Sequence, residues 1–423
     1  MSVSSIDVLH LDDASLVKAH QHSNRRRRLF SVLLLLPLLV YTAIFFALPI
    51  GMMLYRAVSN PELLQAFPRT ITALSEVNAA SPTLLPEAPV FDALEQDFIN
   101  APNIAVIGEA ARRLNYENSG YRFLIMSTAR QYKKPASDDP LVTTAQQRLA
   151  AIDPRWVSPQ LWADFRRASP AYSPNYLLAA LDLKQTDQGV EAVPENQRVY
   201  IDLILKTLKI ALIVSLLCLL LGFPFAALMV KASRPVQVLL FLAVMLPFWT
   251  SLLARTTAWI VVLQEKGIVN TLLLRLGLID QPLPMIFNLL GVYIVMVHIL
   301  LPFSVLPLYN VMKSIPPHYM RASASLGAHP LRGFFHVYLP MTLTGIGSGT
   351  LLTFIVAAGY YVTPTLVGSA REQMLGYFIA FYTNTTVNWG MASALGLVLI
   401  ACVLVIYLLA ARLVGIRQIA GLR

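Results

Sequence analysis

Cysteine is almost missing from this chain of 423 residues, which holds only Cys218 and Cys402. Both lie inside apolar runs, so the sequence offers neither a disulfide framework nor a cysteine-based metal site, and we interpret both as packing residues. Charge is scarce too: charged residues make up 13% of the chain and hydrophobic residues 56%. A soluble domain of this length needs far more charged surface, so these shortages argue against a soluble protein.

Motifs for nucleotide binding and catalysis are missing as well. The sequence contains no G-x-x-x-x-G-K-[S/T] phosphate loop, no histidine–glutamate zinc spacing and no nucleophile elbow. Its seven histidines are scattered, and we interpret them as structural or solvent-facing. We therefore expect no catalytic residue, no metal ligand and no cofactor bound by this chain.

The sequence does contain several long apolar runs. They predict an all-α polytopic membrane protein with six transmembrane helices, because each run approaches or exceeds the roughly 20 residues that cross a bilayer. The predicted spans are 29–55, 208–230, 236–262, 286–310, 340–366 and 389–412. A secretory signal is the alternative for the first run, which follows four arginines, but the run is too long for one.

Positive charge flanks these runs. The net charge of +10 would suit a nucleic-acid-binding protein, but outside one polar insert the basic residues mostly lie next to apolar segments. By the positive-inside rule, the basic segments place the N-terminal tail 1–28 and the C-terminal tail 413–423 in the cytoplasm.

Residues 56–199 differ in character from the rest of the chain. They carry charges of both signs, several prolines and no membrane-length run. We expect a soluble, mostly helical insert on the outer side of the membrane, and Trp156 and Trp162 indicate that it has a packed core. It lacks cysteine, so no disulfide holds it.

A small, basic segment, RASASLGAHPLRGFFHVYLP, separates two apolar runs at residues 321–340. Gly327 is suited to the left-handed conformation that ends a helix, and Pro330 to the start of a second one. Leu331, Phe334, Phe335 and Tyr338 would share one face of that second helix. We expect a short helix on the cytoplasmic surface that exposes small and basic residues. A plain interfacial connector is the alternative.

This segment resembles the coupling motif of ABC transporter permeases of the binding-protein-dependent type, and the resemblance implies a coupling segment at residues 314–339. The matching positions are Ala322, Leu326, Gly327, Ala328, Phe335, Leu339 and Pro340, whereas Arg321 stands where the family usually has Glu and Ser323 replaces the second Ala. The resemblance implies that Arg321, Ala322, Ser323, Ala324, Leu326, Gly327, Ala328 and Pro340 couple the chain to an ATPase subunit. The change at Arg321 removes any salt bridge made by the family Glu.

The resemblance extends from about Thr207 to the C-terminus. PFWTSLLARTTAWIVVL, GIVNTLLLRLGL, LLPFSVLPLYNVM and VTPTLVGS look like the spermidine/putrescine-type branch. It implies a type-1 transmembrane domain at 205–412 in a bacterial inner membrane. It also implies a second permease subunit, two ATPase subunits carrying ATP and Mg, and a periplasmic solute-binding protein. The solute would be polyamine-like, with an amino-acid-like or opine-like solute left open.

Candidate path residues are few. An ionisable side chain inside a membrane is costly and therefore a functional candidate, which singles out Arg255, although a snorkelling arginine is the simpler interpretation. Trp249, Trp259, Tyr360 and Tyr361 are candidates for an external gate, with an aromatic belt as the alternative. Gly359 and Pro364 predict a broken helix at the outer end of the fifth span.

Two other functions compete with an importer subunit. A self-sufficient secondary transporter would need buried ion-coordinating acids or an inverted repeat with broken helices, and the sequence indicates neither. A membrane-anchored sensor that works through its insert would leave segment 321–340 without a purpose.

Overall fold

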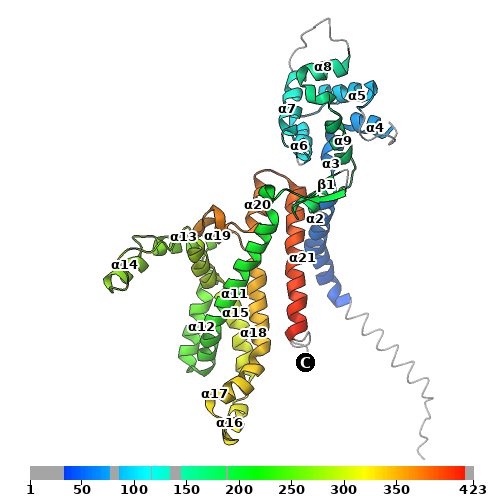
Figure 1. The fold of residues 1–423 in the computed structure, drawn as a ribbon. Coiled ribbons are helices and arrows are strands. Elements are labelled where there is room, and N and C mark those ends of the chain that lie inside the picture. The colour runs from blue at the N-terminus through cyan, green and yellow to red at the C-terminus, as the bar shows by residue number, and fades with distance from the viewer. Residues whose placement is uncertain (1–32, 77–84, 116, 134–143, 187–188, 415–423) are drawn as a thin grey trace, which may run out of the picture. The chain divides into compact units, whose positions relative to one another are not determined.

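The computed structural model describes residues 33–76, 85–115, 117–133, 144–186 and 189–414. The chain divides into two compact units, residues 1–55 and 56–423. The described residues are almost entirely helical (Figure 1), which confirms the predicted all-α class. Five of the described helices are long and apolar enough to cross a membrane, and a bent pair makes a sixth candidate.

The first apolar helix runs from Leu33 to Val58. At about 1.5 Å per residue its 26 residues exceed the ~30 Å hydrocarbon core. It contains a π-helical turn, η1 (Ala43–Ala47), followed by α2 (Leu48–Val58). Pro49 explains this turn, because proline cannot donate to the carbonyl of Phe45 and its ring pushes against that group.

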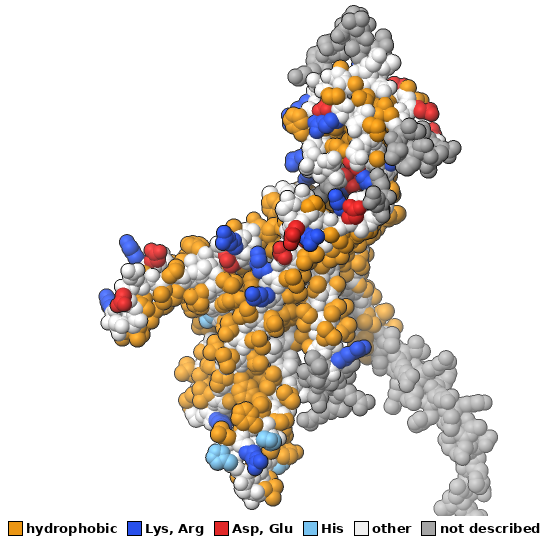
Figure 2. All heavy atoms as spheres, viewed as in Figure 1, with side chains coloured by type: hydrophobic (Ala, Val, Ile, Leu, Met, Phe, Trp, Pro, Cys, Tyr) orange, Lys and Arg blue, Asp and Glu red, His pale blue; other side chains and the backbone are white. Residues whose placement is uncertain are grey.

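Three long helices form the centre of the transmembrane bundle: α11 (Tyr200–Lys231), α15 (Leu289–Ser314) and α18 (Leu339–Ala358). Glycines bring them together around Ser304. A β-carbon on Gly349 would lie 2.8 Å from the Ser304 carbonyl oxygen, and one on Gly222 would lie 3.1 Å from its Oγ. Small residues let membrane helices approach this closely. The outer sides of the bundle are covered by hydrophobic side chains (Figure 2).

The predicted span 236–262 is not one straight helix. It begins with α12 (Arg234–Trp249), and the chain then bends by 106° at residues 250–251. Beyond the bend lie α13 (Leu252–Leu263) and α14 (Ile268–Arg275). Pro247 lies just before the break. Apolar periodicity cannot reveal this bend, because both arms of the helix are equally apolar.

The predicted span 340–366 also differs from a single helix. It begins earlier, because α17 (Pro330–Gly333) and the π-helical turn η4 (Phe334–Tyr338) lead directly into α18. Pro340 accounts for this turn in the same way as Pro49 does for η1. At its other end α18 stops at Ala358, and the short α19 (Val362–Val367) follows. The break predicted from Gly359 and Pro364 is therefore confirmed.

The chain closes with η5 (Ala370–Glu372), α20 (Leu375–Asn384) and α21 (Trp389–Val414). α20 and α21 pack against each other, and α21 matches the predicted span 389–412.

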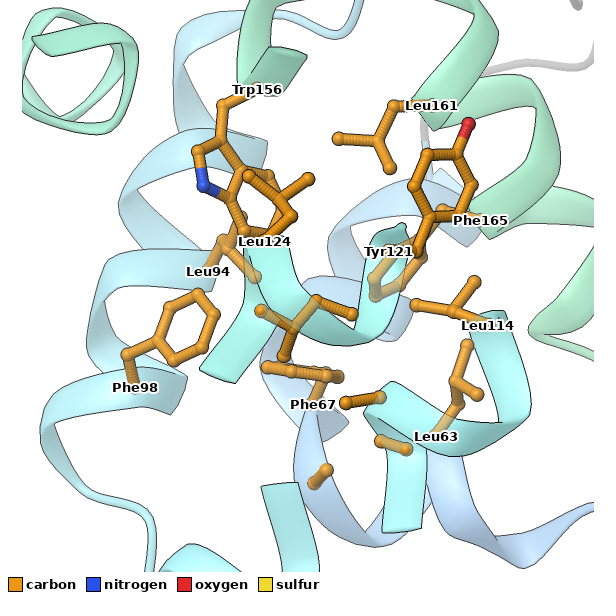
Figure 3. Close-up of a cluster of buried hydrophobic side chains, with 14 of the residues drawn as sticks. Leu63, Phe67, Leu94, Phe98, Leu114, Tyr121, Leu124, Trp156, Leu161 and Phe165 are labelled. Atoms are coloured by element: carbon orange, nitrogen blue, oxygen red, sulfur yellow. The ribbon is translucent and has the colours of Figure 1, made fainter. Parts of the chain in front are cut away.

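The insert has its own core (Figure 3). Its helices are α3 (Pro61–Ala66), α4 (Pro68–Glu76), α5 (Ala88–Ile99), α6 (Ile104–Leu114), α7 (Tyr121–Tyr132), α8 (Ala145–Ile152), η2 (Pro154–Val157) and α9 (Pro159–Ala168). Trp156 and Trp162 are fully buried, as the sequence predicts, and each indole N–H finds an acceptor: Trp156 donates to Thr128 Oγ1 and Trp162 to the Trp156 carbonyl, both at 2.8 Å.

The two ends of this helical core meet. Asn60 N–H donates to the Ala171 carbonyl at 2.9 Å, and its side-chain amide donates to the Pro170 carbonyl at 3.1 Å. Beyond this closure lie α10 (Asn175–Ala179), the antiparallel strands β1 (Leu183–Thr186) and β2 (Gly189–Ala192), and η3 (Glu195–Gln197). The chain then enters α11.

Candidate functional site: the coupling segment and the gate

The coupling segment is a helix with a sharply defined end. α16 (His318–Ser325) starts after Pro316–Pro317 and is followed by Gly327 at φ +79°. Ala328 N–H donates to the Ser323 carbonyl at 3.1 Å, and Gly327 N–H donates to the Ala324 carbonyl at 2.9 Å. These two bonds form a Schellman motif, which needs a residue free to adopt positive φ at Gly327.

A second glycine fixes the angle between α16 and α17. A β-carbon on Gly333 would lie 3.1 Å from Ser323 Oγ and 3.3 Å from Met320 Cε. Ser323 therefore faces the neighbouring helix and is half-buried. The small residue at 323 is explained by this internal packing, not by an exposed docking surface.

The other predicted coupling residues divide by exposure. Arg321, Ala322, Ala324, Leu326 and Gly327 are exposed, and Ala328 is half-buried. Leu326 has 89% of its surface exposed, so the tip presents one large apolar side chain.

Pro340 and the predicted apolar face behave differently. Pro340 is exposed in the helix that follows, beyond the tip itself. Leu331 and Phe335 are exposed, whereas Phe334 and Tyr338 turn inward and stack on each other at 5.9 Å between ring centroids. The prediction of one shared face was wrong, because the π-helical turn rotates the residues out of the 3.6-residue period.

Histidines gather at this same end of the bundle, which sequence reasoning treated as scattered. His318, His329 and His336 are exposed, with Arg332 and Lys313 nearby in sequence. Figure 2 shows histidine and basic side chains together there. The sequence contains no acidic residue between Asp280 and Glu372, so this surface is cationic.

The candidate gate begins at the break in the third span. Arg255 folds back on the break: its Nε donates to Thr250 Oγ1 at 3.1 Å and its Nη2 to the Thr250 carbonyl at 2.8 Å. A carbonyl left without a helical partner in a membrane needs such a donor. Trp249, beside this break, has 73% of its surface exposed.

Trp259 has a partner that the sequence did not indicate. Its Nε1 donates to Nδ1 of His298 in α15 at 3.1 Å, and the two rings lie 5.2 Å apart. The two residues are 39 positions apart in sequence, so only the fold reveals this polar pair within the spans.

The two tyrosines occupy the break between α18 and α19. Tyr360 is half-buried and packs on the same apolar cluster as Trp259, whereas Tyr361 has 38% of its surface exposed. Thr256 of α13 and Thr363 of α19 approach to 3.4 Å between hydroxyl oxygens. The two broken helices thus meet. Trp259 and Tyr360 pack on one apolar cluster, whereas Trp249 and Tyr361 lie on the surface.

Comparison with known proteins identifies this domain. The family model described as "Binding-protein-dependent transport system inner membrane component" matches residues 211–415. The chain is 35% identical over 219 residues to the spermidine/putrescine transport system permease protein PotB of Escherichia coli K12, covering 51% of this chain and 80% of that protein. The chain belongs to this family of transport permeases.

Two further relatives agree. The permease is 35% identical to the Haemophilus influenzae PotB, over 51% of this chain and 77% of that one. It is 33% identical to the E. coli inner membrane ABC transporter permease protein YdcU, over 49% of this chain and 70% of that protein. A chain from the crystal structure of a bacterial ABC transporter involved in the import of the acidic polysaccharide alginate aligns with a TM-score of 0.39 at 18% identity. The alignment covers 52% of this chain and 85% of that chain. The interpretation as an ABC permease of the polyamine branch is confirmed, and the relatives are transport subunits, not enzymes.

Proposed function

We propose that this permease is the membrane-spanning subunit of an ATP-driven importer for a small, polyamine-like organic solute in a bacterial inner membrane. It acts with a second permease subunit, two ATPase subunits that hold ATP and Mg, and a periplasmic solute-binding protein. Its termini lie in the cytoplasm. The solute class rests on the relatives named as spermidine/putrescine permeases.

The observation that carries this proposal is the coupling segment. α16 ends in a glycine turn that exposes Leu326 and small neighbours, and short connections at residues 315–317 and 326–329 join it to two spans. α15 leads into it, and α17 and η4 lead out into α18 without a break. Movement of an ATPase subunit docked on α16 would therefore be passed to both central helices.

The test uses the permease co-expressed with the products of neighbouring genes and reconstituted in proteoliposomes. Putrescine and spermidine should stimulate ATP hydrolysis and enter the vesicles only with the binding protein present. Gly327→Trp should abolish stimulation while the subunits still assemble. Gly277→Trp is the matched control, because Gly277 ends α14 in the same left-handed conformation at φ +66°. Uptake by the permease alone, driven by an ion gradient, would contradict the proposal.

A second solute class has one observation in its favour. No acidic residue occurs between Asp202 and Glu265 or between Asp280 and Glu372, whereas Arg255 lies at the break of the third span. Cations favour carboxylates and aromatic faces, so this arrangement suits an amino-acid-like or opine-like solute with a carboxylate. Competition of arginine or an opine against labelled putrescine would decide between the two classes.

The insert is proposed to help dock the binding protein or to shield the gate. Because Asn60 and Ala171 lie side by side, residues 61–169 can be replaced by a short Gly/Ser linker without separating the ends of the chain. We expect this deletion to weaken binding-protein affinity or transport. Full transport with unchanged affinity would refute the role.

A further inference from the structure

A polar cavity lies where the insert meets the start of α21. It has a volume of about 230 Å³. One wall comes from α3, α6 and Tyr176 together with Arg56 and Ser59, and the other comes from residues 387–390. At about 30 Å³ per water, it has room for roughly seven waters or a small organic molecule.

Three buried polar atoms in this wall lack a hydrogen-bond partner within the described residues: Ser59 Oγ, Glu62 Oε2 and Arg113 Nη2. Ser59 is 4% exposed and Arg113 1% exposed. Buried polar groups are nearly always paired, and leaving one unpaired is costly. Three such atoms in one cavity point to an occupant that supplies both a donor and an acceptor.

Two of the three guanidinium nitrogens of Arg113 already have hydrogen-bond partners, which leaves Nη2 for that occupant. Arg113 Nε donates to Asn60 Oδ1 at 2.9 Å, and Nη1 donates to Glu117 Oε1 at 2.9 Å. Nη2 therefore remains as a donor that the other two hydrogen bonds hold in place. It suits an anionic oxygen, because charge-assisted hydrogen bonds are the stronger ones.

Glu62 supplies the opposite charge. Tyr176 donates to its Oε1 at 3.3 Å, while Oε2 stays unpaired. Desolvation raises the pKa of Glu62, so its carboxylate gains most from a cation placed beside it.

The charges around the cavity balance once the carboxylates behind its wall are counted. Arg56, Arg112, Arg113, Glu62 and Glu109 line the cavity. Glu117 lies outside the lining and pairs with Arg113 at 2.9 Å, while Arg167 shares Glu117 and also pairs with Asp164. A site that is neutral overall but carries separated charges favours a ligand that is also neutral overall with separated charges. A simple anion or a diamine would leave one of the two charged groups unmatched.

We propose that this cavity binds a small zwitterion whose anionic group pairs with Arg113 and whose ammonium group pairs with Glu62. Both charged partners belong to the insert, and the bound zwitterion fills the space between them and residues 387–390, next to the point where Arg112 donates to the Thr386 carbonyl. This site is separate from the broken spans of the candidate gate and does not depend on the transported solute.

The test measures binding to the full-length permease in nanodiscs of phosphatidylglycerol, which contain no zwitterionic headgroup. Four probes are compared by equilibrium dialysis: glycine, 4-aminobutyrate, acetate and putrescine. At least one of the two zwitterions should bind saturably at one site per chain, and acetate and putrescine should bind at least tenfold more weakly. If binding of the free zwitterion disappears when phosphatidylethanolamine is included, the site is assigned to the lipid headgroup. If binding is unchanged, the site is assigned to the free solute.

Variants locate the site. Glu62→Gln and Ser59→Ala should each weaken binding, the former at least tenfold, because a neutral amide cannot balance an ammonium group. Glu191→Gln, an exposed change in β2, is the control and should have no effect. No saturable binding of either zwitterion up to about 10 mM, where a millimolar site would fill, would overturn the proposal. So would equal binding by wild type and Glu62→Gln.

Discussion

Tyr176 lies directly across Gly390, so closely that a β-carbon on the glycine would sit 2.4 Å from Tyr176 Cε2. Gly390 belongs to the first turn of α21, and Tyr176 to α10 of the insert. The same ring contacts Arg113, whose Cζ lies 5.8 Å from the ring centroid. The absence of a side chain at Gly390 is therefore what allows the insert to pack on the last span.

Gly390→Ala should loosen this junction. Overpacking typically costs about 1–3 kcal/mol, because the neighbouring groups must shift. Thermal unfolding of the purified permease would reveal the loss. Gly108→Ala is the matched control in α6, where a β-carbon would meet only Met126 Sδ at 3.8 Å. It should be neutral or slightly stabilising through helix propensity. Equal effects of the two variants would refute the close contact.

The glycines around Ser304 give a prediction that separates side-chain contact from backbone contact. Gly222→Ala and Gly349→Ala should both destabilise the bundle. Ser304→Ala should partly rescue Gly222→Ala, which meets Ser304 Oγ, but not Gly349→Ala, which meets the Ser304 carbonyl. Unfolding of the single and double variants in detergent would measure this coupling. Equal rescue of both would contradict the packing described.

The hydrogen bond between Trp259 and His298 should be measurable as a coupling energy. Comparison of Trp259→Phe, His298→Leu and the double variant should give a coupling energy of about 0.6 kcal/mol and at most about 1.7 kcal/mol, the average and the maximum for polar pairs between membrane helices. Additive effects of the two changes would show that the pair contributes nothing. If the residues also serve the gate, both single variants should lower uptake without preventing assembly.

The insert should lose stability in acid through Glu95. The side-chain hydrogen bonds from Arg148 lower the pKa of Glu95, with Nε donating to Oε1 at 2.6 Å. A lowered folded-state pKa gives stability that is present above the unfolded value, near 4.5, and is lost as pH falls through the folded pKa. Glu95→Gln should therefore flatten the stability profile below about pH 5.

The measurement needs a signal from the insert alone. A permease with Trp249, Trp259 and Trp389 changed to Phe retains only Trp156 and Trp162, both in the insert core. Denaturant unfolding followed by their fluorescence at pH 7 and pH 4 would give the profile. Glu191→Gln should leave the profile unchanged, and a Glu95→Gln profile identical to that of wild type would contradict the prediction.

Local sequence patterns predicted the structural features that depend on residue type and on short spacing along the chain. Gly327 ends a helix because only glycine readily adopts that backbone, and Trp156 and Trp162 form a core because large aromatic side chains must be buried. The bend after Trp249 was missed, since an apolar pattern is the same on either side of it. The Trp259–His298 pair and the cavity beside Arg113 join segments distant in sequence, and no local pattern indicates such meetings.

The most direct test of the coupling role is a cross-link from the exposed tip. In a permease with Cys218 and Cys402 replaced by serine, Leu326→Cys should cross-link through a bismaleimide to a cysteine in the docking groove of the ATPase subunit. Leu276→Cys is the control, because Leu276 is 61% exposed and precedes Gly277 as Leu326 precedes Gly327. A cross-link at 326 and none at 276 is the predicted result. No cross-link at 326, or equal cross-linking at both positions, would contradict the account.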